Sequence, residues 1–368
     1  MKITTKTAHF TNPLYLESGR ILEPYDITYE TYGEMNEDKS NVIVVCHALT
    51  GSHHAAGQYE GESKPGWWNA LIGSQKAIDT DRYFVICTNV IGSCFGSSGP
   101  MSAVYPSMEP YRYKFPVLTI KDMVHAQNIL YLSLGIYKVH AIIGGSMGGM
   151  QALQFAVDFP RFAKNIIMLA STSATRPWAI AFNKISQEAI LKDPSFAGGY
   201  YNPEDIKENG LSGLSVARMA GHISFLSHDS MDKKFGREYT RTDGLYELFG
   251  QFQVERYLEY NAYNFSQRFD PLSYLYIIKA INIFDISRGY DSLEKALKSI
   301  RAKLYLISFE SDMLFTPKEM LEIHHAMKRI GKEDQSNYLE VESDYGHDAF
   351  LVETEKFSSY IESALKGD

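Results

Sequence analysis

The stretch that decides the fold reads Val139-His140-Ala141-Ile142-Ile143-Gly144-Gly145-Ser146-Met147-Gly148-Gly149-Met150-Gln151-Ala152-Leu153. A β-branched apolar run passes into glycines and then into a helical apolar spacing, which predicts a strand, a tight turn and a helix. Gly144, Ser146 and Gly148 match the G-x-S-x-G pattern, in which a strained turn exposes the serine and a flanking Cβ would collide with a neighbouring element. We therefore predict Ser146 as a nucleophile; the plain alternative is a glycine-rich connection with an inert serine.

A serine nucleophile needs a histidine base and an acid that orients it. With this turn, the acid follows a later strand and the histidine lies near the end of the chain. The strand predicted from residue 303 to residue 309 runs into Glu310 and Asp312. We predict Asp312 as the acid, and Glu310 is its competitor. The alternative is that both are solvated turn residues without a catalytic role.

The histidine predicted as the base is His347, which follows the last predicted strand and a glycine. The other histidines downstream of Asp312 are His324 and His325, which fall in an amphipathic helical pattern over residues 318–329. Surface or packing roles suit that pair better than catalysis.

Acyl transfer also needs N–H donors that face the developing oxyanion. One donor is expected to be the backbone N–H of Met147, directly after the nucleophile and at the positive end of the next helix. The second is expected in the loop that follows an early strand, where residues 46–51 read CHALTG. We choose the backbone N–H of Leu49, although an ordinary turn at the end of a strand is the alternative.

Several short apolar runs are typical of strands that are buried on both faces. They lie at residues 42–46, 83–87, 139–143, 165–169 and 304–307, and another strand signal begins near Tyr338. A helix is predicted over residues 119–134, with Gly135 as its C-cap, and a closing helix over residues 353–365. Strands that alternate with helices indicate an α/β fold with a mostly parallel sheet flanked by helices.

The sequence changes character between residues 175 and 300, where aromatic and charged residues recur at helical spacing, for example over 245–263 and 274–284. We predict a helical insertion over 175–300, between a first core part at 1–174 and a second at 301–368. Its dense Tyr and Phe residues suit a lid or a subunit interface, and core packing is the alternative.

Composition excludes several classes of protein. The 368 residues are 45% hydrophobic and carry a formal net charge of −8, which disfavours a disordered chain and a nucleic-acid partner. Three cysteines without a C-x-x-C pair fit a reducing compartment and offer no zinc half-site. No signal peptide or membrane span is indicated, so the cytoplasm is the expected location. Neither a metal nor a permanently bound cofactor is expected, because no phosphate-binding loop and no H-E-x-x-H pattern occur.

Motifs along nearly the whole chain together resemble those of the homoserine O-acetyltransferases, which have the α/β-hydrolase fold and serve one route to methionine. The motifs are HALTGS at 47–52, GWWN at 66–69, DTDRYFVI at 79–86, GSSGP at 96–100, the stretch 144–153, and GHDAFL at 346–351. The resemblance implies Ser146 as nucleophile, His347 as base and Asp312 as orienting acid, in agreement with the triad predicted from order and spacing.

The resemblance also implies two substrate-binding residues. Asp348 would bind the amino group of homoserine and Arg218 its carboxylate, which suits the two charges of an amino acid. The expected reaction moves an acetyl group from acetyl-CoA, a co-substrate, to the γ-hydroxyl of L-homoserine through an acyl-serine. The family and the aromatic insertion together imply a homodimer joined through that insertion.

The sequence departs from the usual family pattern at residues 223–226 (ISFL) and 280–282 (AIN). Homoserine O-succinyltransferase and serine O-acetyltransferase activities are therefore alternatives on the same scaffold. A lipase-type or esterase hydrolase and a catalytically silent binding protein are rivals from other classes, although the intact triad disfavours the silent protein.

Overall fold

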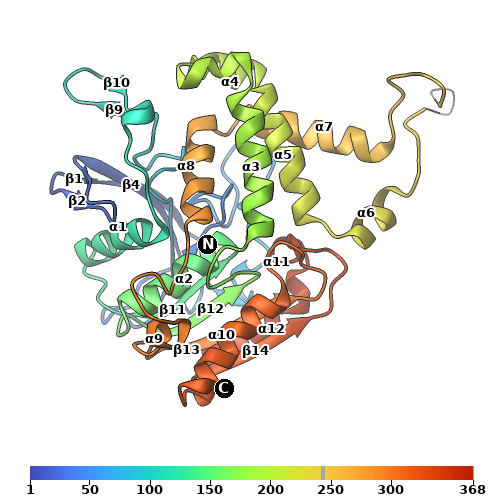
Figure 1. Cartoon of the computed structure of the whole chain (residues 1–368). Helices are drawn as coiled ribbons and strands as arrows, with labels where there is room; N and C mark the ends of the chain where they lie inside the picture. Colours follow the sequence, from blue (N-terminus) through green and yellow to red (C-terminus); the bar gives the residue numbers. More distant parts are fainter. Residues whose placement is uncertain (242–244, 368) are drawn as a thin grey trace.

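A computed structural model describes residues 1–241 and 245–367. Its centre is an eight-stranded sheet with the order β1-β4-β8-β5-β11-β12-β13-β14 (Figure 1). The strands from β8 to β14 are parallel, and β4 and β1 extend the sheet antiparallel at one edge. The strands are β1 (Ile3–Phe10), β4 (Tyr25–Tyr32), β5 (Val42–Cys46), β8 (Phe84–Thr88), β11 (Val139–Gly145), β12 (Ala163–Leu169), β13 (Lys303–Phe309) and β14 (Ser336–Val341). Three short pairs lie outside this sheet: β2 (Leu14–Tyr15) with β3 (Ile21–Leu22), β6 (Ile72–Gly73) with β7 (Ile78–Asp79), and β9 (Ala103–Val104) with β10 (Glu109–Pro110).

The parallel strands are buried on both faces because alternate side chains enter two separate apolar clusters. In β5, Val42, Val44 and Cys46 join one cluster, and Ile43 and Val45 join the other. The first cluster is covered by helices α1, α2 and α10, and the second by α12. This arrangement confirms the predicted α/β class and the predicted mostly parallel sheet.

The helices of the core are α1 (Ile120–Ser133), α2 (Met147–Asp158), α9 (Leu293–Leu297), α10 (Pro317–Arg329), α11 (Ala349–Val352) and α12 (Ser358–Lys366). The expected helix over residues 119–134 is α1, which begins at a capping box of Thr119 with Asp122. It ends before Gly135, whose positive φ of 69° a glycine accepts without strain. The expected closing helix is shorter than predicted, since a 3-10 turn (Thr354–Lys356) precedes α12.

The insertion is a layer of helices above the carboxyl ends of the strands (Figure 1). It contains α3 (Pro177–Leu191), α4 (Pro203–Asn209), α5 (Ser212–Phe225), α6 (His228–Phe235), α7 (Gln253–Ser266) and α8 (Pro271–Asn282). At its base, the Thr175 N–H donates to Phe284 and the Ile286 N–H donates to Ser173. Helix α9 follows these two hydrogen-bonded segments at the base of the insertion and packs against α10 of the core. The predicted limits of 175 and 300 stay a proposal for the extent of the insertion, although α9 lies inside the limit of 300 and packs against the core.

Two features of the fold differ from the expectations. Helix α7 begins at Gln253 rather than near Leu245, because residues 245–249 form turns and the Thr240 N–H donates to Gln251 just before the helix. The antiparallel strands β1 and β4 were not predicted, since neither contains an apolar run: β1 is mostly polar, and β4 alternates polar residues with Tyr and Ile. Among the described residues, no helix is long and apolar enough to cross a membrane.

Candidate active site

Ser146 stands at the turn between β11 and α2, above the middle of the sheet. Its backbone has a φ of 57° and a ψ of −125°, a strained conformation for a residue with a side chain. The turn closes tightly, because a Cβ on Gly144 would lie 2.4 Å from the Gly148 carbonyl carbon and a Cβ on Gly148 would lie 2.1 Å from the Cys46 carbonyl oxygen. The collisions expected from the G-x-S-x-G pattern are thus confirmed.

The structure brings together the three residues of the predicted triad, which come from three loops at the same edge of the sheet. His347 Nε2 lies 2.9 Å from Ser146 Oγ, and His347 Nδ1 lies 2.8 Å from Asp312 Oδ2. All three residues are buried. This chain of contacts allows the imidazole to accept a proton from the serine while the carboxylate holds the ring in place.

Asp312 is held by the turn that follows β13. Its Oδ1 accepts hydrogen bonds from the backbone N–H groups of Leu314 at 2.8 Å and Phe315 at 3.0 Å, which leaves Oδ2 for the imidazole. The competitor Glu310 is exposed. The other downstream histidine pair lies on α10, where His324 bonds to Ser336 Oγ.

The electrostatics of the site raise the basicity of the histidine. Burial works to lower the pKa of His347, but the carboxylates of Asp312 and Asp348 outweigh burial and hold this pKa above its ordinary value of 6.5. An imidazolium at this position is therefore stabilised.

The two predicted oxyanion donors lie on either side of Ser146. Met147 is the first residue of α2, so its N–H belongs to the first turn, where backbone donors have no partner within the helix. Leu49 follows β5 and lines the same cavity as Ser146. Among the described residues, no acceptor bonds to the Leu49 N–H.

A cavity opens above the serine and is lined by Ser146, His347, Arg218 and Asp348, among others. Desolvation in the cavity lowers the pKa of Arg218 and raises that of Asp348, and each charge opposes the shift of the other. Within the described chain the Arg218 Nε has no hydrogen-bond partner, and no direct ion pair joins this guanidinium to Asp348. The cavity therefore presents one cation and one anion that are both open to a ligand.

The loop that carries the histidine is bonded directly to the end of α5. The Asp348 N–H donates to Phe225 at 3.1 Å, and Leu226 forms an isolated β-bridge with Gly346. Gly346 has a φ of 84°, and a Cβ on this residue would lie 2.7 Å from the Phe225 carbonyl oxygen. A glycine is required for this close approach of insertion and core.

The comparisons with known proteins agree with this geometry. The chain matches the family described as alpha/beta hydrolase fold over residues 41–354. A protein of Sulfurimonas autotrophica named homoserine O-acetyltransferase is 69% identical over 367 residues, which is 100% of both chains. This chain belongs to the homoserine O-acetyltransferase family. The resemblance seen in the motifs, and the α/β-hydrolase fold that it implied, are confirmed.

Two solved structures are similar to this member of the homoserine O-acetyltransferase family. The homoserine O-acetyltransferase of Bacillus anthracis is 28% identical, with a TM-score of 0.91 and coverage of 99% of this chain and 98% of that one. Esterase E22 is 27% identical, with a TM-score of 0.89 and coverage of 99% and 100%. The same architecture therefore occurs in proteins named as transferases and as esterases.

The departures of this homoserine O-acetyltransferase family member from the usual pattern lie in the cavity wall. Ser224, Phe225 and Ile281 all line the cavity beside Arg218. The sequence pattern marked these segments without indicating where they lie. Among the described residues, no cluster of three or more His, Cys, Asp or Glu side chains is arranged to hold a metal ion.

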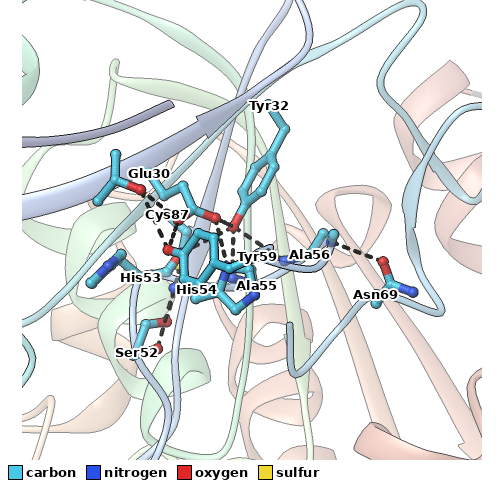
Figure 2. A network of polar contacts seen from close by, with 12 residues as sticks. Glu30, Tyr32, Ser52, His53, His54, Ala55, Ala56, Tyr59, Asn69 and Cys87 are labelled. Carbon is cyan, nitrogen blue, oxygen red and sulfur yellow. Dashed lines mark hydrogen bonds and ion pairs between the residues drawn. The ribbon is translucent and has the colours of Figure 1, made fainter. Parts of the chain in front are cut away.

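Sequence reasoning missed a polar network beyond the loop that carries Leu49. Figure 2 shows Glu30 surrounded by Tyr32, His54 and Tyr59. Glu30 is fully buried, and its carboxylate accepts from the hydroxyls of both tyrosines and lies 2.9 Å from His54 Nδ1. The Tyr32 hydroxyl in turn accepts from the backbone N–H groups of Ala55 and Ala56. Apart from the contact of Tyr32 with Glu30 within β4, these contacts join positions more than 20 residues apart, so the sequence alone does not indicate the network.

Proposed function

We propose that this protein transfers an acetyl group from acetyl-CoA to the γ-hydroxyl of L-homoserine through an acetyl-serine intermediate. The observation that carries the proposal is the contact of Ser146 with His347 in a cavity that also holds Arg218 and Asp348. A nucleophile with its base and a pair of opposite charges suit an acyl transfer to an amino acid.

In the first half-reaction, His347 takes the proton of Ser146 as Oγ attacks the thioester carbon of acetyl-CoA. The resulting oxyanion accepts from the N–H groups of Leu49 and Met147, a kind of contact worth about 3 kcal/mol per donor. The carbon–sulfur bond then breaks, and the CoA sulfur leaves as a thiol with the proton from His347. Asp312 keeps the imidazole in the required orientation throughout.

In the second half-reaction, the γ-hydroxyl of homoserine gives its proton to His347 and attacks the acetyl carbon. The ester forms, and Ser146 regains the proton as its bond to the acetyl group breaks. Asp348 binds the ammonium of the acceptor and Arg218 its carboxylate, so the hydroxyl is held near the acyl group. Water competes poorly with a held acceptor under the helical insertion, because the insertion covers the cavity.

Ester hydrolysis is a second candidate function, which the similarity to esterase E22 favours. A hydrolase would release CoA thiol continuously from acetyl-CoA alone. A transferase releases about one equivalent per active site and then stops until an acceptor arrives, as expected for a ping-pong reaction.

The deciding experiment combines mass spectrometry with a thiol-release assay. With acetyl-CoA alone, the wild type is expected to gain one acetyl group on the peptide containing Ser146, and Ser146→Ala none. Thiol release is then followed with acetyl-CoA or succinyl-CoA as donor and with homoserine, serine or no acceptor. An acetyl adduct on the active-site peptide of Ser146→Ala would refute the intermediate, and continuous turnover without acceptor would favour the hydrolase.

We also propose that two copies of the chain associate through the insertion. The segment before α7 exposes Tyr246, Leu248 and Phe249, at 96%, 89% and 88% of their surfaces. Exposed aromatic and aliphatic side chains in one segment are typical of protein interfaces. The three cysteines are unpaired, which suits the expected cytoplasmic location, where acetyl-CoA is also available.

A further inference from the structure

His47 follows directly on β5 and is fully buried beside the active-site cavity. Its side chain has two partners: the Val90 backbone N–H donates to Nε2 at 3.0 Å, and Nδ1 lies 2.8 Å from the Ala48 carbonyl oxygen. The imidazole thus joins the loop after β5 to the loop after the neighbouring strand β8.

These partners fix the state of the imidazole. Because Nε2 accepts a hydrogen bond, it carries no proton, and the proton of the neutral ring must lie on Nδ1. Burial lowers the pKa of His47 to about 4, so the ring is neutral at neutral pH. Nδ1–H therefore donates to the Ala48 carbonyl oxygen.

This bond orients the peptide group that also contains the Leu49 N–H. In a trans peptide, the C=O of one residue and the N–H of the next point in opposite directions. The bond between Ala48 and Leu49 is trans, since the cis bonds of the described chain are Glu23–Pro24 and Tyr105–Pro106. With its carbonyl held by His47, the peptide directs the Leu49 N–H the opposite way, and Leu49 lines the cavity.

Two backbone carbonyls of the loop have further partners. Gln151 Nε2 donates to the His47 carbonyl at 3.0 Å, and the Ala48 carbonyl, which His47 also holds, accepts a second hydrogen bond from the Gly51 N–H at 3.0 Å. Farther along, the buried network around Glu30 and Tyr32 holds the loop at its other end (Figure 2). Of these side chains, His47 alone bonds to the peptide that carries the Leu49 N–H.

We propose that His47 is a positioning residue that holds the Ala48–Leu49 peptide so that its N–H faces the oxyanion. The proposal rests on the proposed function, in which Leu49 is one of the two oxyanion donors. His47 touches neither the acyl group nor the acceptor, and acts only through the backbone of the next two residues.

The test uses the full chain and two substitutions that each remove one bond of His47. The side-chain nitrogen of Asn can take the place of Nδ1, and the side-chain oxygen of Gln the place of Nε2. His47→Asn therefore keeps the donor to Ala48 and loses the acceptor for Val90, and His47→Gln does the reverse. Each variant loses one buried hydrogen bond, so comparable falls in Tm are expected.

The rate of CoA thiol release in a single turnover with acetyl-CoA separates the variants. We expect His47→Gln to lower this rate on the order of 10- to 100-fold without a change in the KM for acetyl-CoA. His47→Asn should stay within about threefold of the wild type, because the peptide remains held. Equal rates in the two variants, or a change in KM alone, would overturn the proposal.

Tyr59→Phe is the matched control, since it removes the hydrogen bond to Glu30 and a longer contact with Thr5 at the far end of the loop. We expect a lower Tm with the wild-type rate of thiol release. A rate as low as that of His47→Gln would indicate general loosening of the loop and would refute the role of His47.

Two further measurements keep the outcomes distinct. Failure of the wild type to form an acetyl-enzyme refutes the proposed function, whereas indistinguishable variants of a working enzyme refute only the role of His47. If neither variant folds, nitrogen NMR of the wild-type histidine rings decides. A proton on Nδ1 of His47 supports the proposal, and a proton on Nε2 overturns it.

Discussion

The raised pKa of His347 sets the pH dependence expected at the level of a single residue. The base must be neutral, so the kcat/KM for acetyl-CoA should fall as the pH drops through this pKa, which lies above 6.5. Asp312→Asn removes a carboxylate that raises the pKa, so the acid limb of the profile should move to lower pH. The same variant should lower kcat by roughly 10⁴-fold. An acid limb that stays in place in Asp312→Asn would contradict this explanation.

Arg218 is the residue that should separate the two half-reactions. Arg218→Ala removes the proposed partner of the acceptor carboxylate, so the kcat/KM for homoserine should fall by about 10- to 100-fold. Acetylation of Ser146 by acetyl-CoA should remain near the wild-type rate, as measured by single-turnover thiol release. The control is Arg268→Ala, which removes a neighbouring arginine that does not line the cavity. Unchanged kcat/KM for homoserine in Arg218→Ala would refute the proposal that Arg218 binds the acceptor carboxylate.

Sequence and structure agree best for residues whose role is set locally. Ser146 could be predicted because the strained turn and its glycines are contiguous, and Asp312 and His347 follow from their order along the chain. Arg218 and Asp348 came from the family resemblance instead, since an arginine on an insertion helix has no distinctive local pattern. His47 stood in a recognised motif, but its two partners could be identified only from the folded loops.

At the level of elements, the junction of β11 with α2 should tolerate no added methyl group. Gly148→Ala would place its Cβ 2.1 Å from the Cys46 carbonyl oxygen, a backbone atom that cannot easily move. We expect a loss of about 1–3 kcal/mol or more in the free energy of unfolding, measured by denaturant titration. Gly289→Ala is the control: its Cβ meets nothing within 4 Å and its φ of 87° adds only local strain. A Gly148→Ala protein as stable as Gly289→Ala would contradict the close contact.

The elements that the sequence predicted are those with continuous apolar runs. Five strands of the parallel part of the sheet could be located in this way because both of their faces are buried. The sequence did not predict the antiparallel strands β1 and β4, since their stability depends on their pairing with each other, which runs from Ile3 with Tyr32 to Phe10 with Tyr25. Such pairing is a long-range property. Similarly, the buried Glu30 is acceptable only because Tyr32 and, from distant parts of the chain, Thr5 and His54 satisfy its carboxylate.

At the level of the whole molecule, the insertion extends to one side of the core through α6 and α7 (Figure 1). If this region joins two copies, Phe249→Glu should weaken the dimer, because it places a charge in an apolar interface. Light scattering coupled to size-exclusion chromatography should then give the mass of one chain instead of two. The control is Tyr137→Glu. Tyr137 is an aromatic residue outside the insertion, and 71% of its surface is exposed. A wild type that is monomeric would refute the dimer proposal.

The bonds between α5 and the loop of His347 also bear on how this scaffold can be re-engineered. Leu226 pairs with Gly346, and the Asp348 N–H donates to Phe225, so the helix that carries Arg218 and the loop that carries His347 share one backbone junction. A transplanted helical layer from a relative would have to bring residues 343–348 with it, or the base would be displaced from the serine. New acceptor preferences are thus more accessible through substitutions within α5 than through exchange of the entire layer.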